Sequence, residues 1–140
     1  MQEGMINILD LIPQRSPIVM VDNFCGIDNL GKSYTELTLR EDNIFIEDGK
    51  LSECGLIEHI AQSAAARVGC LAQTNNEPVP IGFIGSVNNF QLYVNPLLGE
   101  KINTSVEIIQ DVMNISLIES VCMVSDKIVA TCRMKIFLDK

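Results

Sequence analysis

Residues 52–72 read SECGLIEHIAQSAAARVGCLA, and this stretch decides the fold. It has no proline, and its apolar residues recur at spacings of three and four, which predicts an amphipathic helix. The apolar stripe comprises Ile57, Ile60, Ala61, Ala64, Val68 and Leu71. Ser52 is placed to cap the N-terminus, Glu53 suits the positive end of the helix dipole, and Thr74-Asn75-Asn76 would close the helix. Its many alanines make the helix thin, so that a sheet can approach it closely.

A second line on the same helix runs through Glu58, Gln62, Ala65 and Gly69. Residues four apart lie one above the other on a helix surface. A glutamate and a glutamine do not belong on a purely structural helix face. We therefore expect this line to face either water or a site.

Composition limits the possible classes of protein. A chain of 140 residues with 47% hydrophobic content predicts one domain over residues 1–140. The formal charge of −8, with ten scattered Lys and Arg residues, argues against nucleic acid and anionic membranes as partners. No apolar run approaches the ~20 residues that span a bilayer. Five cysteines without metal-ligand spacing and the lack of a secretion signal predict free thiols in the cytoplasm, with no metal or cofactor.

The rest of the chain predicts mainly strands. Residues 6–12 predict one or two helical turns, and 16–22 predict either a buried strand or a segment that closes over the core. Period-2 alternation predicts a strand over 33–40, before a loop over 41–50. Turn residues then separate four more predicted strands, over 81–93, 101–109, 115–124 and 127–138.

One long helix followed by four antiparallel strands predicts an α+β architecture in which the sheet curls around a single central helix. That arrangement is the hot-dog fold. The long strand over 81–93 is polar at Ser86, Asn88 and Asn89, where a second copy would pair with it. We expect a homodimer or a higher oligomer, because a long unpaired edge strand must be covered.

Three motifs carry a resemblance to a known family. Residues 11–22, LIPQRSPIVMVD, resemble the L-(L/I)-P-H-R-x-P-x-L-L-V-D opening of 3-hydroxyacyl-acyl-carrier-protein dehydratases. Residues 58–62, EHIAQ, look like that family's E-x-M-A-Q, and 90–100 are similar to its phenylalanine-containing strand followed by P-x-x-P-G-(D/E). Residues 45–62 resemble still more closely a divergent branch found beside aryl-polyene synthesis genes, with the pattern F-x-x-x-G-x-L-x-x-x-x-(I/L)-E-x-(M/I)-A-Q.

The resemblance implies catalytic residues. Dehydration needs a base for the C2 proton, an acid for the departing hydroxyl, and donors at the thioester carbonyl. Glu58 matches the family carboxylate and would be the acid/base, with Gln62 orienting it. The family's loop histidine is absent from 43–49, and the P-H-R histidine is Gln14 here. The one imidazole is His59, which lies about 100° around the helix from Glu58 and would reach the substrate only if the pocket wraps around the helix.

Substrate-binding roles are predicted for Gly55, Gly85 and Phe45, with the Gly55 backbone N–H placed to meet a thioester carbonyl. Glu47 or Asp48 would be a substitute for the lost histidine, although both read more simply as solvated charges. Cys54, near a helix N-terminus, is a further candidate nucleophile, although the cysteines read more simply as inert.

Two classes of function follow. The first is a lyase of fatty acid or polyene-type lipid synthesis that removes water from a 3-hydroxyacyl thioester of acyl carrier protein or coenzyme A. Its acyl chain would run into an apolar tunnel at the dimer interface. The second is a catalytically weak acyl-binding subunit that pairs with an active hot-dog partner, and an acyl thioesterase is a weaker third. Docking of an acidic carrier protein would need a basic patch formed by Arg15, Arg40, Arg67 and Lys135.

Overall fold

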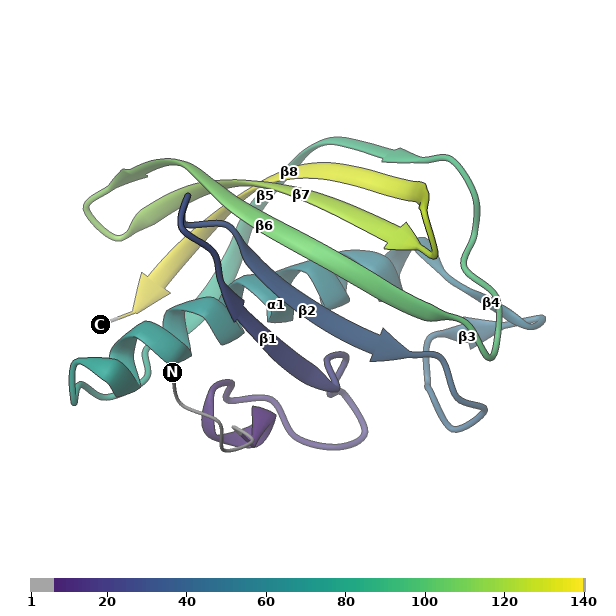
Figure 1. The fold of residues 1–140 in the computed structure, drawn as a ribbon, viewed down its shortest axis with the longest axis horizontal. Coiled ribbons are helices and arrows are strands. Elements are labelled where there is room, and N and C mark those ends of the chain that lie inside the picture. The colour runs from purple at the N-terminus through teal and green to yellow at the C-terminus, as the bar shows by residue number, and fades with distance from the viewer. Residues whose placement is uncertain (1–6, 140) are drawn as a thin grey trace.

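The computed structural model describes residues 7–139. Its longest helix, α1, is Glu53–Thr74, and a single 3-10 turn, η1, is Ile8–Asp10. The strands are β1 (Asn23–Ile27), β2 (Ser33–Thr38), β3 (Ile46–Glu47), β4 (Lys50–Leu51), β5 (Ile81–Leu92), β6 (Lys101–Val112), β7 (Ile115–Val124) and β8 (Lys127–Asp139). Figure 1 shows a curved sheet that lies over the one long helix.

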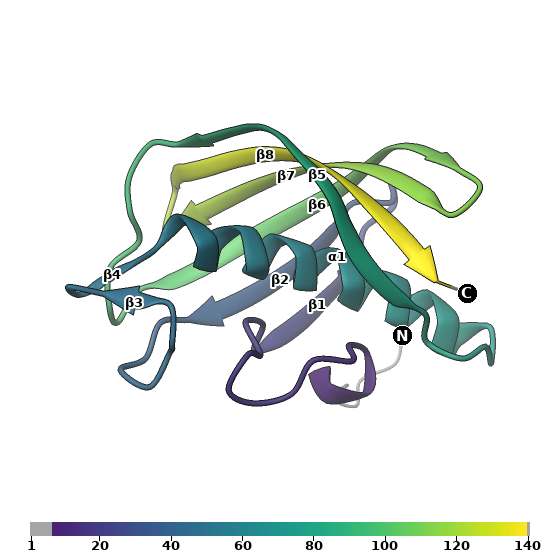
Figure 2. The ribbon, with the colours of Figure 1, turned by 180° about the vertical axis from the view of Figure 1, so that it is seen from behind.

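The six main strands form an antiparallel sheet in the order β1-β2-β6-β7-β8-β5. The short β3–β4 hairpin precedes α1 and stands apart from this sheet. In Figure 2 strand β5 crosses the C-terminal half of α1, so the sheet curls around the helix on that side. The α+β architecture expected from the sequence is therefore confirmed.

Helix α1 begins and ends where the residue pattern predicts. The Ser52 hydroxyl accepts a hydrogen bond from the Gly55 N–H at 3.1 Å and so satisfies one of the free donors of the first turn. At the other end, the Asn75 N–H donates to the Leu71 carbonyl at 3.1 Å. Asn76 follows with a φ of 57°, the left-handed conformation that commonly closes a helix.

The main core lies between the concave face of the sheet and α1. The helix contributes Leu56, Ile60 and Ala64, all buried. The strands contribute buried side chains that include Leu37, Ile102, Val106, Ile118, Met134 and Ile136. Each such leucine or isoleucine contributes roughly 1.5–3 kcal/mol through removal of its apolar surface from water.

The predicted strands over 33–40, 81–93, 101–109, 115–124 and 127–138 correspond to β2 and β5–β8, within three residues at each end. Of the predicted turns over 6–12, residue 6 lies outside the described residues, and η1 accounts for 8–10. The β3–β4 hairpin lies in the predicted loop, and β1 lies where no strand was predicted.

Residues 16–22 do not form a strand, which corrects one of the two readings of that segment. Met20 and Val21 are buried, so the alternative reading, a segment that closes over the core, is the observed one. The backbone groups of Met20 pair with side chains of α1 and not with a neighbouring strand. That pairing explains why an extended apolar run stays outside the sheet.

The N-terminal segment (residues 7–22) packs directly on α1. Leu11 and Ile12 form a second cluster with Ala66 of the helix. A Cβ atom built on Gly69 would lie 2.0 Å from the Leu11 carbonyl oxygen, so only glycine permits this contact. Of the line of residues that begins at Glu58, Gln62 and Gly69 are buried under this segment, whereas Glu58 and Ala65 are half-buried.

Between residues 7 and 139, none of the helices combines the length and the apolar character that a membrane crossing requires.

Candidate functional site

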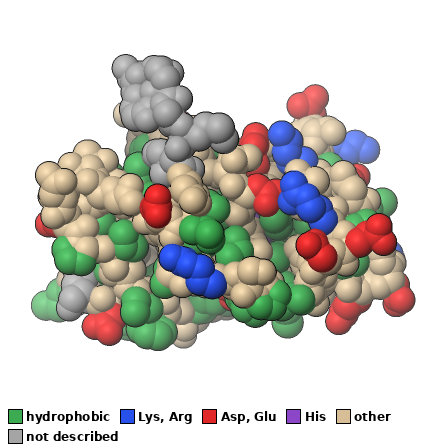
Figure 3. All heavy atoms as spheres, turned by 90° about the horizontal axis from the view of Figure 1, so that it is seen from below, with side chains coloured by type: hydrophobic (Ala, Val, Ile, Leu, Met, Phe, Trp, Pro, Cys, Tyr) green, Lys and Arg blue, Asp and Glu red, His purple; other side chains and the backbone are tan. Residues whose placement is uncertain are grey.

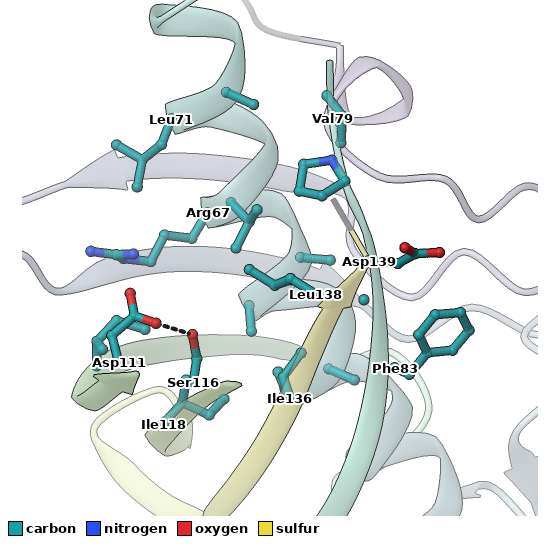
Figure 4. A pocket seen from close by; sticks show the side chains of 18 of the residues that line it. Arg67, Leu71, Val79, Phe83, Asp111, Ser116, Ile118, Ile136, Leu138 and Asp139 are labelled. Atoms are coloured by element: carbon teal, nitrogen blue, oxygen red, sulfur yellow. Dashed lines mark hydrogen bonds between the residues drawn. The ribbon is translucent and has the colours of Figure 1, made fainter. Parts of the chain in front are cut away.

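A cavity of about 760 Å³ lies beside the C-terminal half of α1. Its walls come from the helix, the first part of β5, the last part of β8, and the end of the β6–β7 hairpin. Figure 4 shows Leu71 and Arg67 on the helix facing Ile118, Ile136 and Leu138 on the strands. The volume is in the range of small-molecule sites in proteins, about 300–1,000 Å³.

Small side chains on the helix account for the space. Ala61, Ala64, Ala65 and Val68 line the cavity, and three of these four are alanines. They lie opposite larger apolar side chains of the strands, including Phe83, Ile84 and Ile108. The predicted apolar stripe is therefore shared between two surroundings: Ile60 packs in the core, Val68 and Leu71 border the open space, and Ala64 contacts both. A mostly apolar wall of this kind suits an acyl chain.

Glu58 lies on the wall of this cavity and is half-buried. Its Oε2 atom accepts a hydrogen bond of 2.7 Å from the Nε2 atom of Gln62, one turn further along the helix. Its Oε1 atom has no hydrogen-bond partner among the described residues. The structure thus brings together Glu58 and Gln62, the first two of the three predicted catalytic residues, and leaves one carboxylate oxygen unengaged.

Gln62 is fully buried, and both the oxygen and the nitrogen of its side-chain amide form hydrogen bonds. Its Oε1 atom accepts from the Met20 N–H at 2.6 Å, and its Nε2 atom donates to the Ile18 carbonyl at 2.9 Å as well as to Glu58. One side chain therefore joins the N-terminal segment to the candidate acid/base.

His59 lies away from the cavity, buried between the N-terminal segment and β6. Its Nδ1 atom is 2.6 Å from the Met20 carbonyl oxygen, and its Nε2 atom is 2.7 Å from the Thr104 hydroxyl. Burial lowers the pKa of His59 to about 4, partly offset by the Met20 carbonyl and the Asp22 carboxylate. Both nitrogens of this neutral ring are engaged, so it has no free position for a substrate.

Gln14 occupies the place of the P-H-R histidine and lines the same cavity as Glu58. Its Oε1 atom is buried and has no hydrogen-bond partner within the described part of the chain. An unpaired buried acceptor is uncommon and destabilising, and each one in a native structure needs an explanation. Gln14, like Glu58, is therefore a polar side chain of the cavity wall that is a candidate for a functional role.

The cavity has a charged end formed by Arg67, Asp111 and Ser116. The Ser116 hydroxyl donates to the Asp111 carboxylate at 3.0 Å, and Figure 4 shows the Arg67 side chain extending from α1 toward Asp111. Burial lowers the pKa of Arg67, and the nearby Asp111 carboxylate partly offsets this. Arg67 and Glu58 are nine residues apart, or ~14 Å along the helix axis, so this end is remote from the candidate acid/base.

The three predicted substrate-binding residues lie outside the cavity wall. The Gly55 N–H, expected to meet a thioester carbonyl, donates to the Ser52 cap, and Gly55 packs against Phe45 and Leu51. Phe45 packs against the main core. Gly85 lies at a register shift in β5, where a Cβ atom would collide with the Phe137 ring.

The alternative candidates are also apart from the cavity. Glu47 and Asp48 are exposed at the β3–β4 hairpin, and Cys54 is an exposed thiol in the first turn of α1. Of the proposed basic patch, Arg40 pairs with Asp22 at 3.2 Å and Arg67 lines the cavity. Figure 3 shows Lys and Arg side chains interspersed with Asp and Glu on the face that it views.

Several cavity residues carry no signal in the sequence. Phe83, Asp111 and Ser116 are distant from the helix in the chain and belong to none of the motifs. The alanines of α1 were the one available signal, because small residues at helical spacing leave room beside a helix.

Solved structures resemble this chain over nearly its whole length. "The Dehydratase Heterocomplex ApeI:P from Xenorhabdus doucetiae" matches with a TM-score of 0.90 and 15% identity, over 98% of this chain and 93% of the other. An HP0420 homologue from Helicobacter felis matches with a TM-score of 0.72 and 13% identity, over 98% and 90%. A hypothetical thioesterase with coenzyme A from Streptococcus pneumoniae TIGR4 matches with a TM-score of 0.66 and 9% identity, over 83% and 86%.

Identities this low establish the fold alone, and the predicted hot-dog fold is confirmed. No curated protein sequence matches the chain. The family model described as "ApeP-like: ApeP dehydratase" matches residues 6–140. The resemblance to the divergent dehydratase branch is thereby confirmed, and the chain belongs to the ApeP-like family of dehydratases.

Proposed function

We propose that this chain takes part in the dehydration of a 3-hydroxyacyl thioester, with Glu58 as the group that exchanges protons with the substrate. The observation that carries the proposal is the position of Glu58. This carboxylate is held by Gln62 on the wall of a mostly apolar cavity of about 760 Å³. An acyl chain fits the apolar part of the wall, and the dehydratase family supplies the reaction class.

The reaction needs two proton transfers. The ionised Glu58 carboxylate takes the C2 proton, the released electron pair forms the C2–C3 double bond, and the C3–O bond breaks. The same carboxyl group then gives its proton to the departing hydroxyl, which leaves as water, and Glu58 returns to its ionised form. Its Oε1 atom is the one free for these transfers, because Oε2 is bonded to Gln62.

A second candidate is an acyl-binding subunit that works with a different hot-dog chain. The specific observation in its favour is His59, the one histidine of the sequence, whose two nitrogens are both engaged inside the protein. A partner subunit would supply the missing imidazole. The Xenorhabdus structure is itself named as a dehydratase heterocomplex.

Strand β5 is where a partner would pair. It is a long edge strand of the described sheet, and Ile81, Phe83 and Ile84 on it are exposed. Long apolar edge strands are templates for pairing with another chain. A second copy of this chain and a different hot-dog subunit are the two partners that we propose for it.

The substrate carrier is acyl carrier protein or coenzyme A, in fatty acid or polyene-type lipid synthesis in the cytoplasm. An acyl thioesterase is less favoured. Thioesterases occur among the structural neighbours, but at about 10% identity they share only the fold.

Four preparations test the proposal: the full-length chain alone, the chain with a co-expressed hot-dog partner, and the same two with Glu58→Gln. Formation of the enoyl thioester is followed by its ultraviolet absorbance. Turnover by the chain alone supports the first candidate, and turnover only with the partner supports the second. Glu58→Gln is expected to reduce either rate by ~10²–10⁴-fold.

Glu53→Gln is the matched control, because Glu53 is an exposed carboxylate in the first turn of the same helix and does not line the cavity. Its rate should equal that of the wild type. Absence of turnover in both the chain and the complex would refute the dehydratase proposal. Equal rates for wild type and Glu58→Gln would exclude Glu58 from the mechanism.

A further inference from the structure

His59 is a buried titratable group that takes no part in the proton transfers proposed for Glu58. It lies at the centre of a set of hydrogen bonds that joins β6, the N-terminal segment and α1. The directions of these bonds follow from which atoms are able to donate.

The Met20 carbonyl oxygen only accepts, so the Nδ1 atom of His59, 2.6 Å away, carries the ring proton. In the neutral ring the Nε2 atom is then an acceptor, and the Thr104 hydroxyl donates to it across 2.7 Å. The tautomer of His59 is thus fixed by its two neighbours.

The same logic fixes the Gln62 amide. The Met20 N–H only donates, so the amide atom 2.6 Å from it is the oxygen. The NH₂ group then faces two acceptors, the Ile18 carbonyl at 2.9 Å and the Glu58 Oε2 atom at 2.7 Å. A flipped amide would oppose donor to donor at Met20 and acceptor to acceptor at both other positions.

Met20 is the residue that the two helix side chains share. His59 holds its carbonyl and Gln62 holds its N–H, from positions three residues apart on α1. The place of the Met20 N–H, and with it the orientation of the Gln62 amide, depends on the carbonyl being held. We propose that His59 is a positioning residue for Glu58, acting through Met20 and Gln62 to keep one carboxylate oxygen bonded and the other free in the cavity. This inference rests on the proposed function of Glu58.

Two substitutions separate positioning from simple core packing. His59→Asn keeps an amide donor at the place of Nδ1 and loses the bond to Thr104. His59→Leu keeps an apolar volume but loses both bonds. With a 3-hydroxydecanoyl thioester as substrate, His59→Leu is expected to lower kcat at least tenfold with little change in KM, and His59→Asn to stay within about threefold of the wild type.

The second readout does not depend on turnover. In the wild type the Gln62 side-chain NH₂ resonances should exchange slowly with solvent, because both protons are bonded inside the protein. These resonances are assigned by their loss in Gln62→Leu. His59→Leu should abolish their protection, and His59→Asn should retain it.

Two variants of Thr104 form a second test of the same role, in case His59→Leu fails to fold. Thr104→Val leaves the Nε2 atom unpaired and should lower kcat with KM unchanged, whereas Thr104→Ser keeps the hydroxyl and should match the wild type. Equal kcat losses in His59→Leu and His59→Asn, or unchanged Gln62 protection in His59→Leu, would overturn the positioning role. If no variant and no wild-type preparation turns over substrate, the proposed function fails, and the amide protection still decides the positioning role.

Discussion

Two faces of helix α1 differ in what covers them. One face carries Gln62, Ala66 and Gly69, which are fully buried under the N-terminal segment. The other carries Ala61 and Val68, which border the cavity and stay half-buried. Both faces carry small or polar side chains. The N-terminal segment packs against the first face, whereas the second face borders the cavity.

This difference shows what small residues achieve on a helix. Where another segment lies close, as Leu11 does on Gly69, a missing side chain permits backbone contact. Where the neighbour is a strand that its own large side chains hold further away, the small side chains of the helix leave room for a ligand. Glu58 lies at the boundary between the two faces, in contact with the cavity and bonded to Gln62 of the covered face.

The largest effect should come from Gln62→Leu. The change leaves the Met20 N–H and the Ile18 carbonyl without their partner, and each unpaired buried group costs ~1–3 kcal/mol. We expect the free energy of unfolding to fall by roughly 3–5 kcal/mol, measured by urea denaturation. Gln110→Leu, on an exposed position of β6, is the control and should change it by less than about 0.5 kcal/mol. If Gln62→Leu lowered the free energy of unfolding by no more than this control, Gln62 would not hold the N-terminal segment on α1.

The pH dependence of stability should follow from His59. Its pKa is about 4 in the folded protein against 6.5 as the reference value, so the unfolded chain binds the proton first as the pH falls. The contribution of His59 to the free energy of unfolding is fully present above pH 6.5. It is lost as the pH falls from about 6.5 to 4, by up to roughly 3 kcal/mol. Chemical denaturation at a series of pH values measures it. His59→Asn should flatten the curve in this window, and an unchanged slope would refute the assignment.

Gly69→Ala should destabilise the covered face by a smaller amount. The new methyl group would meet the Leu11 carbonyl, and overpacking of this kind costs ~1–3 kcal/mol, although alanine gains about 1 kcal/mol in helix propensity. Thermal unfolding should show a net loss of up to about 2 kcal/mol. Since Gly69 does not line the cavity, acyl binding by the folded variant should be unchanged. A stabilised Gly69→Ala protein would rule out the close contact.

Val68→Phe should have the smallest effect on stability and a clear effect on binding. The ring enters existing space on the cavity face, so the free energy of unfolding should change by less than about 1 kcal/mol. Affinity for a decanoyl thioester, measured by calorimetry, should fall at least tenfold as the ring takes the place of the acyl chain. Unaltered affinity would show that acyl chains bind elsewhere.

The sequence predicted the helix and the main strands because their signals are local. Apolar spacing, the Ser52 cap and period-2 alternation are properties of neighbouring residues, and α1, β2 and β5–β8 follow from them. Within β8, Ile128 is exposed while Val129 is buried, because the register with β7 shifts there, and that shift has no signal in the local sequence.

The features that the sequence left open or did not predict depend on long-range contacts. Residues 16–22 have the pattern of a strand, but their backbone partners are side chains some 40 residues away on α1. β1 is short and carries a bulge between Phe24 and Gly26, and Gly26 has a φ of 107°, so the strand lacks a clean alternation. Glu58 and Gln62 were identified by their motif, whereas Gln14 and the charged end at Arg67 enter the cavity only through the tertiary fold.

The most direct test of the two-face account is the response of α1 to a ligand. Backbone amide shifts are recorded while a non-reactive 3-hydroxydecanoyl amide is added to the full-length protein. The account predicts progressive shifts at Glu58, Ala61, Ala64 and Val68, with Ala66 and Gly69 unchanged. Shifts confined to Ala66 and Gly69, or no shifts along α1 at a saturating ligand concentration, would contradict it.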